Sequence, residues 1–138
     1  SAKDPTIKVA IPITIPMVTP QPIHVDIPNL HLVKAIIFVE SSGNNNAYCA
    51  SEDAVGCMQI RRVMVRDVNR IVGYKKYKLK DRWDRDKSIE IFNIYCSHYN
   101  LTTPEQKARA WNGGPRGYKK KSTQHYWNKV KSYLAKSR

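Results

Sequence analysis

The chain has 138 residues, and its 41% hydrophobic content is enough for one domain with a core of its own. This composition excludes a wholly disordered chain, and no apolar run reaches the ~20 residues that a membrane-spanning helix needs. The formal charge of +13 indicates a polyanionic partner, and nucleic acid, an anionic membrane and a phosphate-rich bacterial envelope all fit it.

Prolines alternate with isoleucines and valines in the first part of the chain, before Leu30. Proline lacks a backbone donor and blocks helix interiors and central strands, so we expect residues 1–29 to form an extended segment. This segment either lies along the rest of the chain, docks on a partner, or is a poorly ordered tail. Residues 30–138 are expected to form the folded domain.

The first helix is predicted from Leu30, where apolar residues begin to recur at helical spacing. Asn29 is a candidate N-cap, and the polar run over residues 41–46 is a strong stop signal. Glu40 therefore falls in the last turn, where a carboxylate meets the negative end of the helix dipole. A local conflict of this kind is typical of functional sites.

Four further helices are expected, over about residues 63–73, from Ser88 as a cap, from Thr103, and from about Ser122. The Thr103 start is the most specific, because Pro follows the cap and Gln106 stands at the capping-box position. Strands are expected only in a short β-hairpin between residues 47 and 60. The predicted fold class is therefore mainly α.

Cysteine and histidine give no support for a metal site or any other cofactor. Cys49, Cys57 and Cys96 are odd in number and lack zinc-like spacing, and the four histidines are scattered. We interpret the cysteines as reduced structural thiols, with a bridge between Cys49 and Cys57 across a loop as the alternative.

Three short segments at 39–44, 54–60 and 110–117 carry the chemistry, and they read Val-Glu-Ser-Ser-Gly-Asn, Ala-Val-Gly-Cys-Met-Gln-Ile and Ala-Trp-Asn-Gly-Gly-Pro-Arg-Gly. Their order and spacing resemble those of the soluble lytic transglycosylase family, which is related to goose-type lysozyme. Residues 84–89 and 126–130 are similar to two weaker segments of that family. The resemblance covers roughly residues 30–134.

The resemblance implies a lysozyme-like helical domain that cuts peptidoglycan glycan strands at the β-1,4 bond between N-acetylmuramic acid and N-acetylglucosamine. Glu40 would be the single acid and base, and the sugar's own 6-hydroxyl would close a 1,6-anhydro ring. Such acid catalysis requires a raised carboxyl pKa, and Ile36, Ile37 and Val39 can supply an apolar wall. The site of action would be the bacterial cell wall, reached from the periplasm, from outside or by phage delivery.

The same resemblance implies a set of substrate-binding residues: Ser41, Met58, Gln59, Trp111, Asn112 and Gly114. Gln59 and Asn112 offer amides for sugar hydroxyls and N-acetyl groups, and Ser41 can hydrogen-bond the Glu40 carboxylate. Trp111 is suited to stacking on a sugar face, and Met58 lines the cleft in the family. Core packing is the alternative for both Trp111 and Met58.

Two other functions stay open at this point. A lysozyme-type hydrolase would need a second carboxylate, with candidates Glu52, Asp53, Asp67, Asp84 and Asp86. Arg61 stands where goose-type lysozymes have an Asp, which argues against their chemistry. A non-catalytic basic module for glycan or nucleic acid would explain the charge, but no nucleic-acid-binding motif is visible. The lysines at 119–121, with Arg116 before them and Lys129 and Lys131 after, form a basic face suited to anionic envelope polymers, and a solvated helix entry is the alternative.

Overall fold

The computed structural model describes residues 28–137, so the extended segment expected over residues 1–29 lies outside it apart from Pro28 and Asn29. Helices dominate the described residues, which confirms the predicted fold class. The α-helices are α1 (Leu30–Ser41), α2 (Arg62–Val72), α3 (Arg85–His98), α4 (Pro104–Gly113) and α5 (Gln124–Lys136). The short elements are strands β1 (Tyr48–Cys49) and β2 (Ala54–Val55) and 3-10 helices η1 (Leu79–Trp83), η2 (Gly117–Lys119) and η3 (Lys121–Thr123). None of the helices in this part of the chain has the length and apolar character needed to cross a membrane.

Helix α1 has the predicted bounds, and its apolar stripe is buried in the core. Asn29 stands at the N-cap position but does not cap the helix with its side chain. Its amide instead donates to Asn93 Oδ1 at 3.2 Å, and its Oδ1 accepts from Lys107 Nζ at 2.7 Å. Asn29 therefore fastens the start of α1 to α3 and α4.

The predicted hairpin is the two-stranded antiparallel sheet of β1 and β2, in which Tyr48 pairs with Val55. Gly56 follows with a positive φ of 82°, and a Cβ there would collide with the backbone carbonyl of Arg82. The buried Arg82 guanidinium donates to Asp53 O at 3.0 Å and to Ile60 O at 3.2 Å. These contacts hold the hairpin against η1.

Helix α2 ends at Gly73 with φ 94°, as the sequence predicts. The predicted cap of α3 is wrong, because Asp84 occupies the N-cap position and accepts from Lys87 N at 2.9 Å. Ser88 lies inside the helix, fully buried, and its hydroxyl lies 2.7 Å from Asp84 O and 3.2 Å from Arg82 O. A serine hydroxyl can satisfy a preceding carbonyl as readily as it can cap a helix.

Helix α4 has the predicted capping box, formed by Thr103 and Gln106. The final helix starts at Gln124, two residues later than expected, because η3 occupies the preceding turn. Arg109 is buried and joins the two regions, since it donates to Thr123 Oγ1 at 2.8 Å and to Lys120 O at 2.8 Å.

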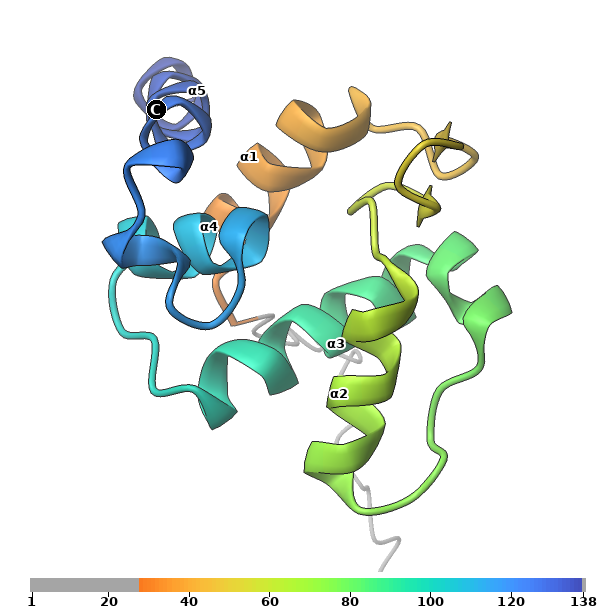
Figure 1. The fold of residues 1–138 in the computed structure, drawn as a ribbon. Coiled ribbons are helices and arrows are strands. Elements are labelled where there is room, and N and C mark those ends of the chain that lie inside the picture. The colour runs from red at the N-terminus through yellow and green to blue at the C-terminus, as the bar shows by residue number, and fades with distance from the viewer. Residues whose placement is uncertain (1–27, 138) are drawn as a thin grey trace, which may run out of the picture.

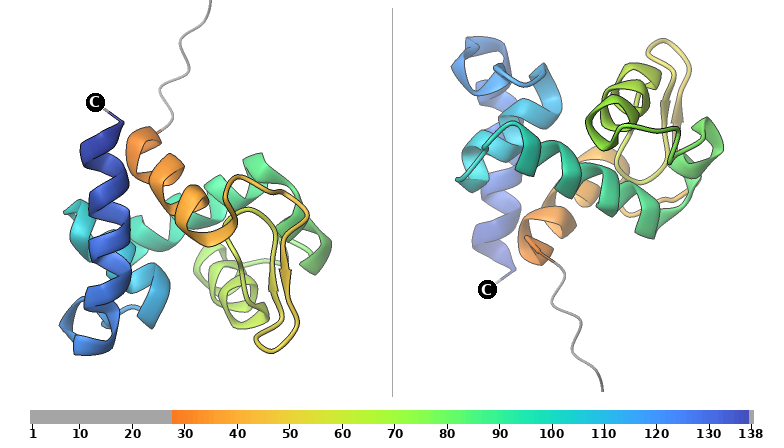
Figure 2. Two further views of the ribbon diagram at one scale, coloured as in Figure 1. Left: turned by 90° about the horizontal axis from the view of Figure 1, so that it is seen from above. Right: turned by 90° about the horizontal axis from the view of Figure 1, so that it is seen from below.

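Figure 1 shows two groups of elements, with α1, α4 and α5 on one side and α2, the hairpin and η1 on the other. Helices α1 and α5 lie side by side in both views of Figure 2, and α4 packs against both. Helix α3 packs against α2 and η1 and runs across to the first group. Edge contacts of Trp111 with Phe92 and Tyr95, at ring-centroid distances of 5.2 and 5.7 Å, connect α3 to α4.

Candidate active site

Glu40 lies in the last turn of α1, where the helix meets α5. The preceding turn, with Ile36 and Ile37, is buried in the core, as the sequence predicts. Tyr126 of α5 donates its hydroxyl proton to Glu40 Oε2 over a long distance of 3.3 Å. The Tyr126 ring is itself buried, so the carboxyl group has protein on the α5 side rather than bulk water.

Burial raises the pKa of Glu40 from its ordinary 4.5 to about 7. The Tyr126 hydrogen bond opposes this increase because it favours the charged carboxylate. The negative charge of Glu52 raises the pKa further, while the positive charges of Arg61 and Lys129 lower it. With a pKa near 7, a substantial share of Glu40 is protonated at neutral pH, as a general acid requires.

Ser41 joins the end of α1 to the loop after the hairpin, and Gln59 holds that loop to the start of the hairpin. The Ser41 hydroxyl does not contact the Glu40 carboxylate as expected, and it lies 2.8 Å from Cys57 O and 3.0 Å from Ile37 O. Gln59 adopts a left-handed φ of 52°, and its amide donates to Gly56 O at 3.0 Å and to Ala47 O at 3.2 Å. Both side chains therefore fix the loop that faces the end of α1, and a role in sugar binding stays a prediction.

Met58 and Trp111 are buried in the core. Met58 has no exposed surface, Trp111 is 2% exposed, and the indole Nε1 donates to Met58 O at 3.0 Å. The burial favours the packing alternative for both residues. Through this one bond, α4 is held against the backbone that carries Gln59.

Asn112 and Gly114 lie at the end of α4. Asn112 is exposed, so its amide is accessible to a ligand. Gly114 is the C-cap with φ 95°, and the space around its Cα is open. Gly114 and Trp111 line a pocket of about 390 Å³ beside α2 that also includes Arg61.

Most candidates for a second carboxylate are already engaged. Asp53 accepts from Arg62 at 2.7 Å and from Arg82 at 3.3 Å. Asp67 accepts from Arg70 at 2.7 Å and from the Tyr99 hydroxyl. Asp84 caps α3. Asp86 lies in the first turn of α3, and Glu52 is exposed in the hairpin loop.

The three cysteines are free thiols, in agreement with the interpretation of reduced structural residues. Cys57 and Cys96 are buried, and burial raises the pKa of the Cys96 thiol to about 12. Both therefore act as packing residues rather than nucleophiles.

A family model described as Transglycosylase SLT domain matches residues 28–134. The chain belongs to this family. It is a member of the lysozyme-like superfamily, and SLT domains are lytic transglycosylases that act on peptidoglycan. No curated protein and no solved structure matches the chain.

Tyr126 contacts Glu40, and the sequence alone gives no direct indication of this contact. Its separation from Glu40 by 86 positions hides the contact from any local pattern. The only signal was the similarity of residues 126–130 to a family segment. The influence of Arg61 and Lys129 on the pKa of Glu40 emerges only from the fold.

The substitution Tyr126→Phe tests how far this hydroxyl supports Glu40. Loss of the hydrogen bond should raise the Glu40 pKa further and reduce peptidoglycan cleavage by about tenfold, the usual scale for one hydrogen bond to a charged group. The measurement is a pH–rate profile, whose basic limb should move to higher pH. Tyr133→Phe, on the same helix but stacked on Phe38 at 4.7 Å, is the control and should leave the profile unchanged.

Proposed function

We propose that this SLT domain cleaves the bond between N-acetylmuramic acid and N-acetylglucosamine with Glu40 as its only catalytic carboxyl group. The observation that carries the proposal is the Glu40 carboxyl, whose pKa is raised to about 7 by burial and which has the Tyr126 hydroxyl beside it. The same group can then be an acid before bond cleavage and a base after it.

In the first step, the protonated Glu40 gives its proton to the glycosidic oxygen while the bond from that oxygen to the muramic acid C1 breaks. The acetamido group of the same sugar assists from the opposite side. In the second step, the C6 hydroxyl attacks C1, and the Glu40 carboxylate takes up its proton. A 1,6-anhydro ring forms, no water is consumed, and Glu40 returns to its starting state.

Arg61 and the Tyr126 hydroxyl stabilise the charged form of Glu40 between these two steps. After the first transfer Glu40 is negative, and the hydrogen bond together with the positive charges of Arg61 and Lys129 favours that state. Before the first transfer, burial favours the neutral, protonated form of Glu40. The opposing influences place the pKa near the working pH, where a group that both gives and takes a proton is most effective.

A lysozyme-type hydrolysis is the second candidate, and Glu52 is the observation in its favour. The negative charge of Glu52 raises the pKa of Glu40. Within residues 28–137, Glu52 forms no ion pair and no side-chain hydrogen bond. A carboxylate placed across from the acid can activate a water molecule. The product, rather than the bond that is cut, separates the two mechanisms.

The deciding experiment is a digest of purified peptidoglycan with the products measured by mass spectrometry. Anhydro-muramyl ends, which are one water lighter than reducing ends, support the proposed mechanism. Reducing ends would replace it by hydrolysis, with Glu52→Gln as the next variant. Binding without any product would instead favour a basic binding module, and the lysines at 119–121 would then be its first candidate surface for anionic polymers.

A further inference from the structure

The pocket beside α2 has an apolar floor and a basic rim. Its volume is about 390 Å³, and the apolar lining includes Met64 of α2, Trp111 of α4 and Pro115 just beyond α4. Three arginines and one aspartate are its only charged lining residues, which leaves a formal surplus of two positive charges. The charged residues are Arg61, Arg66, Asp67 and Arg70.

Helical geometry explains the rim. Arg66 and Arg70 are one turn apart on α2 and therefore share a face, and Arg61 is the N-cap residue of the same helix. The Arg61 side chain does not cap the helix. The three arginines thus come from one helix and its N-cap, which fixes the spacing of their backbone positions along one side of the pocket.

Asp67 neutralises only one of these arginines. Its Oδ1 accepts from Arg70 Nη2 at 2.7 Å, and its Oδ2 accepts from the Tyr99 hydroxyl. Neither Arg61 nor Arg66 has a carboxylate within ion-pair distance anywhere in residues 28–137. The rim therefore presents two guanidinium groups whose preferred partner is a carboxylate that the described residues do not supply.

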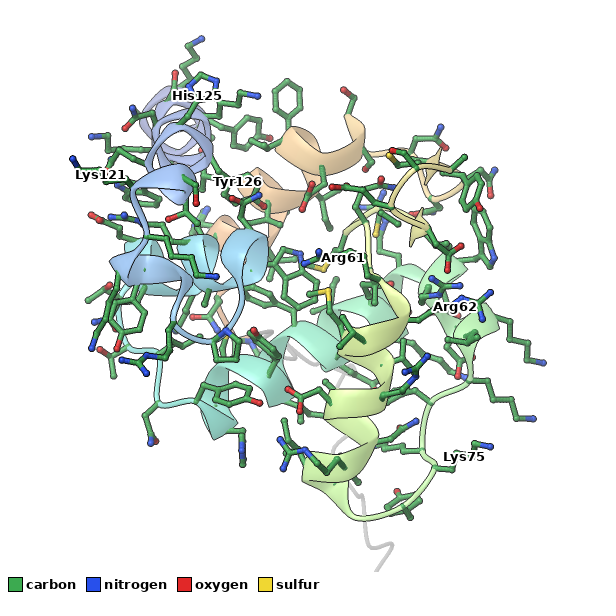
Figure 3. All side chains as sticks on the ribbon, in the orientation of Figure 1. Arg61, Arg62, Lys75, Lys121, His125 and Tyr126 are labelled. Carbon is green, nitrogen blue, oxygen red and sulfur yellow. The ribbon has the colours of Figure 1, made fainter. Side chains whose placement is uncertain are left out.

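The pocket is also next to the candidate active site. Arg61 lines it and acts electrostatically on the Glu40 carboxyl, although Glu40 itself does not line it. Figure 3 shows the side chain of Arg61 directed toward the α1 and α4 side of the molecule, whereas that of Arg62 points the opposite way. A ligand in the pocket would thus lie along the same face as a sugar at Glu40.

We propose that Arg61 and Arg66 form an anionic subsite that binds a carboxylate on the lactyl–peptide arm of N-acetylmuramic acid. This inference rests on the proposed function, because it takes the substrate from there. In the glycan strand the sugar rings carry no charge, so the anionic groups are carboxylates on this arm. They belong either to the peptide or, where the peptide has been removed, to the lactyl group itself.

The subsite gives the enzyme a preference for muramic-acid-containing strands over uncharged N-acetylglucosamine polymers. Arg66 is exposed and Arg61 partly exposed, so the contact should weaken at high salt. The apolar floor excludes water from one side of the arm and strengthens the charged contact. Binding energy gained away from the reacting bond can then orient the sugar at Glu40.

The test measures binding by calorimetry in the Glu40→Gln form, which prevents turnover and removes any effect of the arginines on the Glu40 pKa. Three probes are compared: peptide-bearing glycan fragments, peptide-free fragments with a lactyl carboxylate, and chitooligosaccharide of equal length. Arg66→Gln and Arg61→Gln should each weaken binding of a carboxylate-bearing probe about fivefold, and leave chitooligosaccharide unaffected. Lys75→Gln, which removes one exposed charge far from the pocket, is the matched control.

A loss confined to the peptide-bearing fragments assigns the carboxylate to the peptide, and a loss that includes the peptide-free fragments assigns it to the lactyl group. Equal losses for all three probes, or none for either charged probe, would overturn the subsite. These results are independent of the product digest. Wild type that cuts peptidoglycan while Arg66→Gln binds normally refutes the subsite alone, whereas selective carboxylate binding without cleavage refutes the catalytic proposal alone.

Discussion

Glu40→Gln is expected to reduce peptidoglycan cleavage at least a hundredfold, the lower end of the ~10²–10⁴ range for general acid catalysis. Gln keeps the shape of the protonated side chain and can still accept the Tyr126 hydrogen bond, so the end of α1 should stay in place. It cannot deliver a proton to the leaving oxygen. The loss should therefore fall on the rate of cleavage and leave binding of the glycan strand almost unchanged.

The measurement is the rate of soluble product release from purified peptidoglycan, with binding followed separately by pelleting. Asp86→Asn is the control, since it removes one exposed carboxylate from the first turn of α3. Glu52→Gln distinguishes the two mechanisms: near-normal activity supports a single carboxylate, and a loss as large as that of Glu40→Gln supports hydrolysis by a pair. Unchanged cleavage by Glu40→Gln would refute the assignment of the acid.

The position of Glu40 in the last turn of α1 could be predicted from local features of the sequence. The apolar stripe of α1 and the polar run after Glu40 predict where the helix ends, and the three family-like segments are the basis of the role proposed for Glu40. Its raised pKa was expected from the neighbours on α1, and the fold adds Tyr126, which approaches from α5. No periodicity predicts this contact, because it depends on how α1 and α5 pack.

Helix boundaries were predictable where a single residue near the helix end was suited to the capping position. Gly73 adopts the left-handed conformation at the end of α2, and Thr103 caps α4. The prediction failed where two polar residues competed, since Asp84 caps α3 and Ser88 turns inward. The same limit applies to Ser41, whose hydroxyl had a backbone carbonyl within reach as well as the Glu40 carboxylate.

The second large effect is on stability. The raised Glu40 pKa that suits catalysis lowers the free energy of unfolding once the pH is high enough to ionise the carboxyl group. Burial raises the pKa from 4.5 to about 7, so between these values the folded chain binds more protons than the unfolded chain. Stability must then fall as the pH rises through this window. For a difference of this size the loss from Glu40 alone is about 3 kcal/mol by pH 8.

Glu40→Gln removes this titration and keeps a neutral side chain. The variant should therefore be more stable than wild type by up to about 3 kcal/mol at pH 8, with little difference at pH 4. Urea unfolding of both proteins at pH 4, 6 and 8 measures it, and all other titrating groups cancel in the comparison. Equal stability at pH 8 would mean that the Glu40 carboxylate is solvated, which would also remove the physical basis for its role as an acid. If the variant is inactive and is more stable than wild type only at high pH, then the same buried carboxyl group that supports catalysis destabilises the fold when it is ionised.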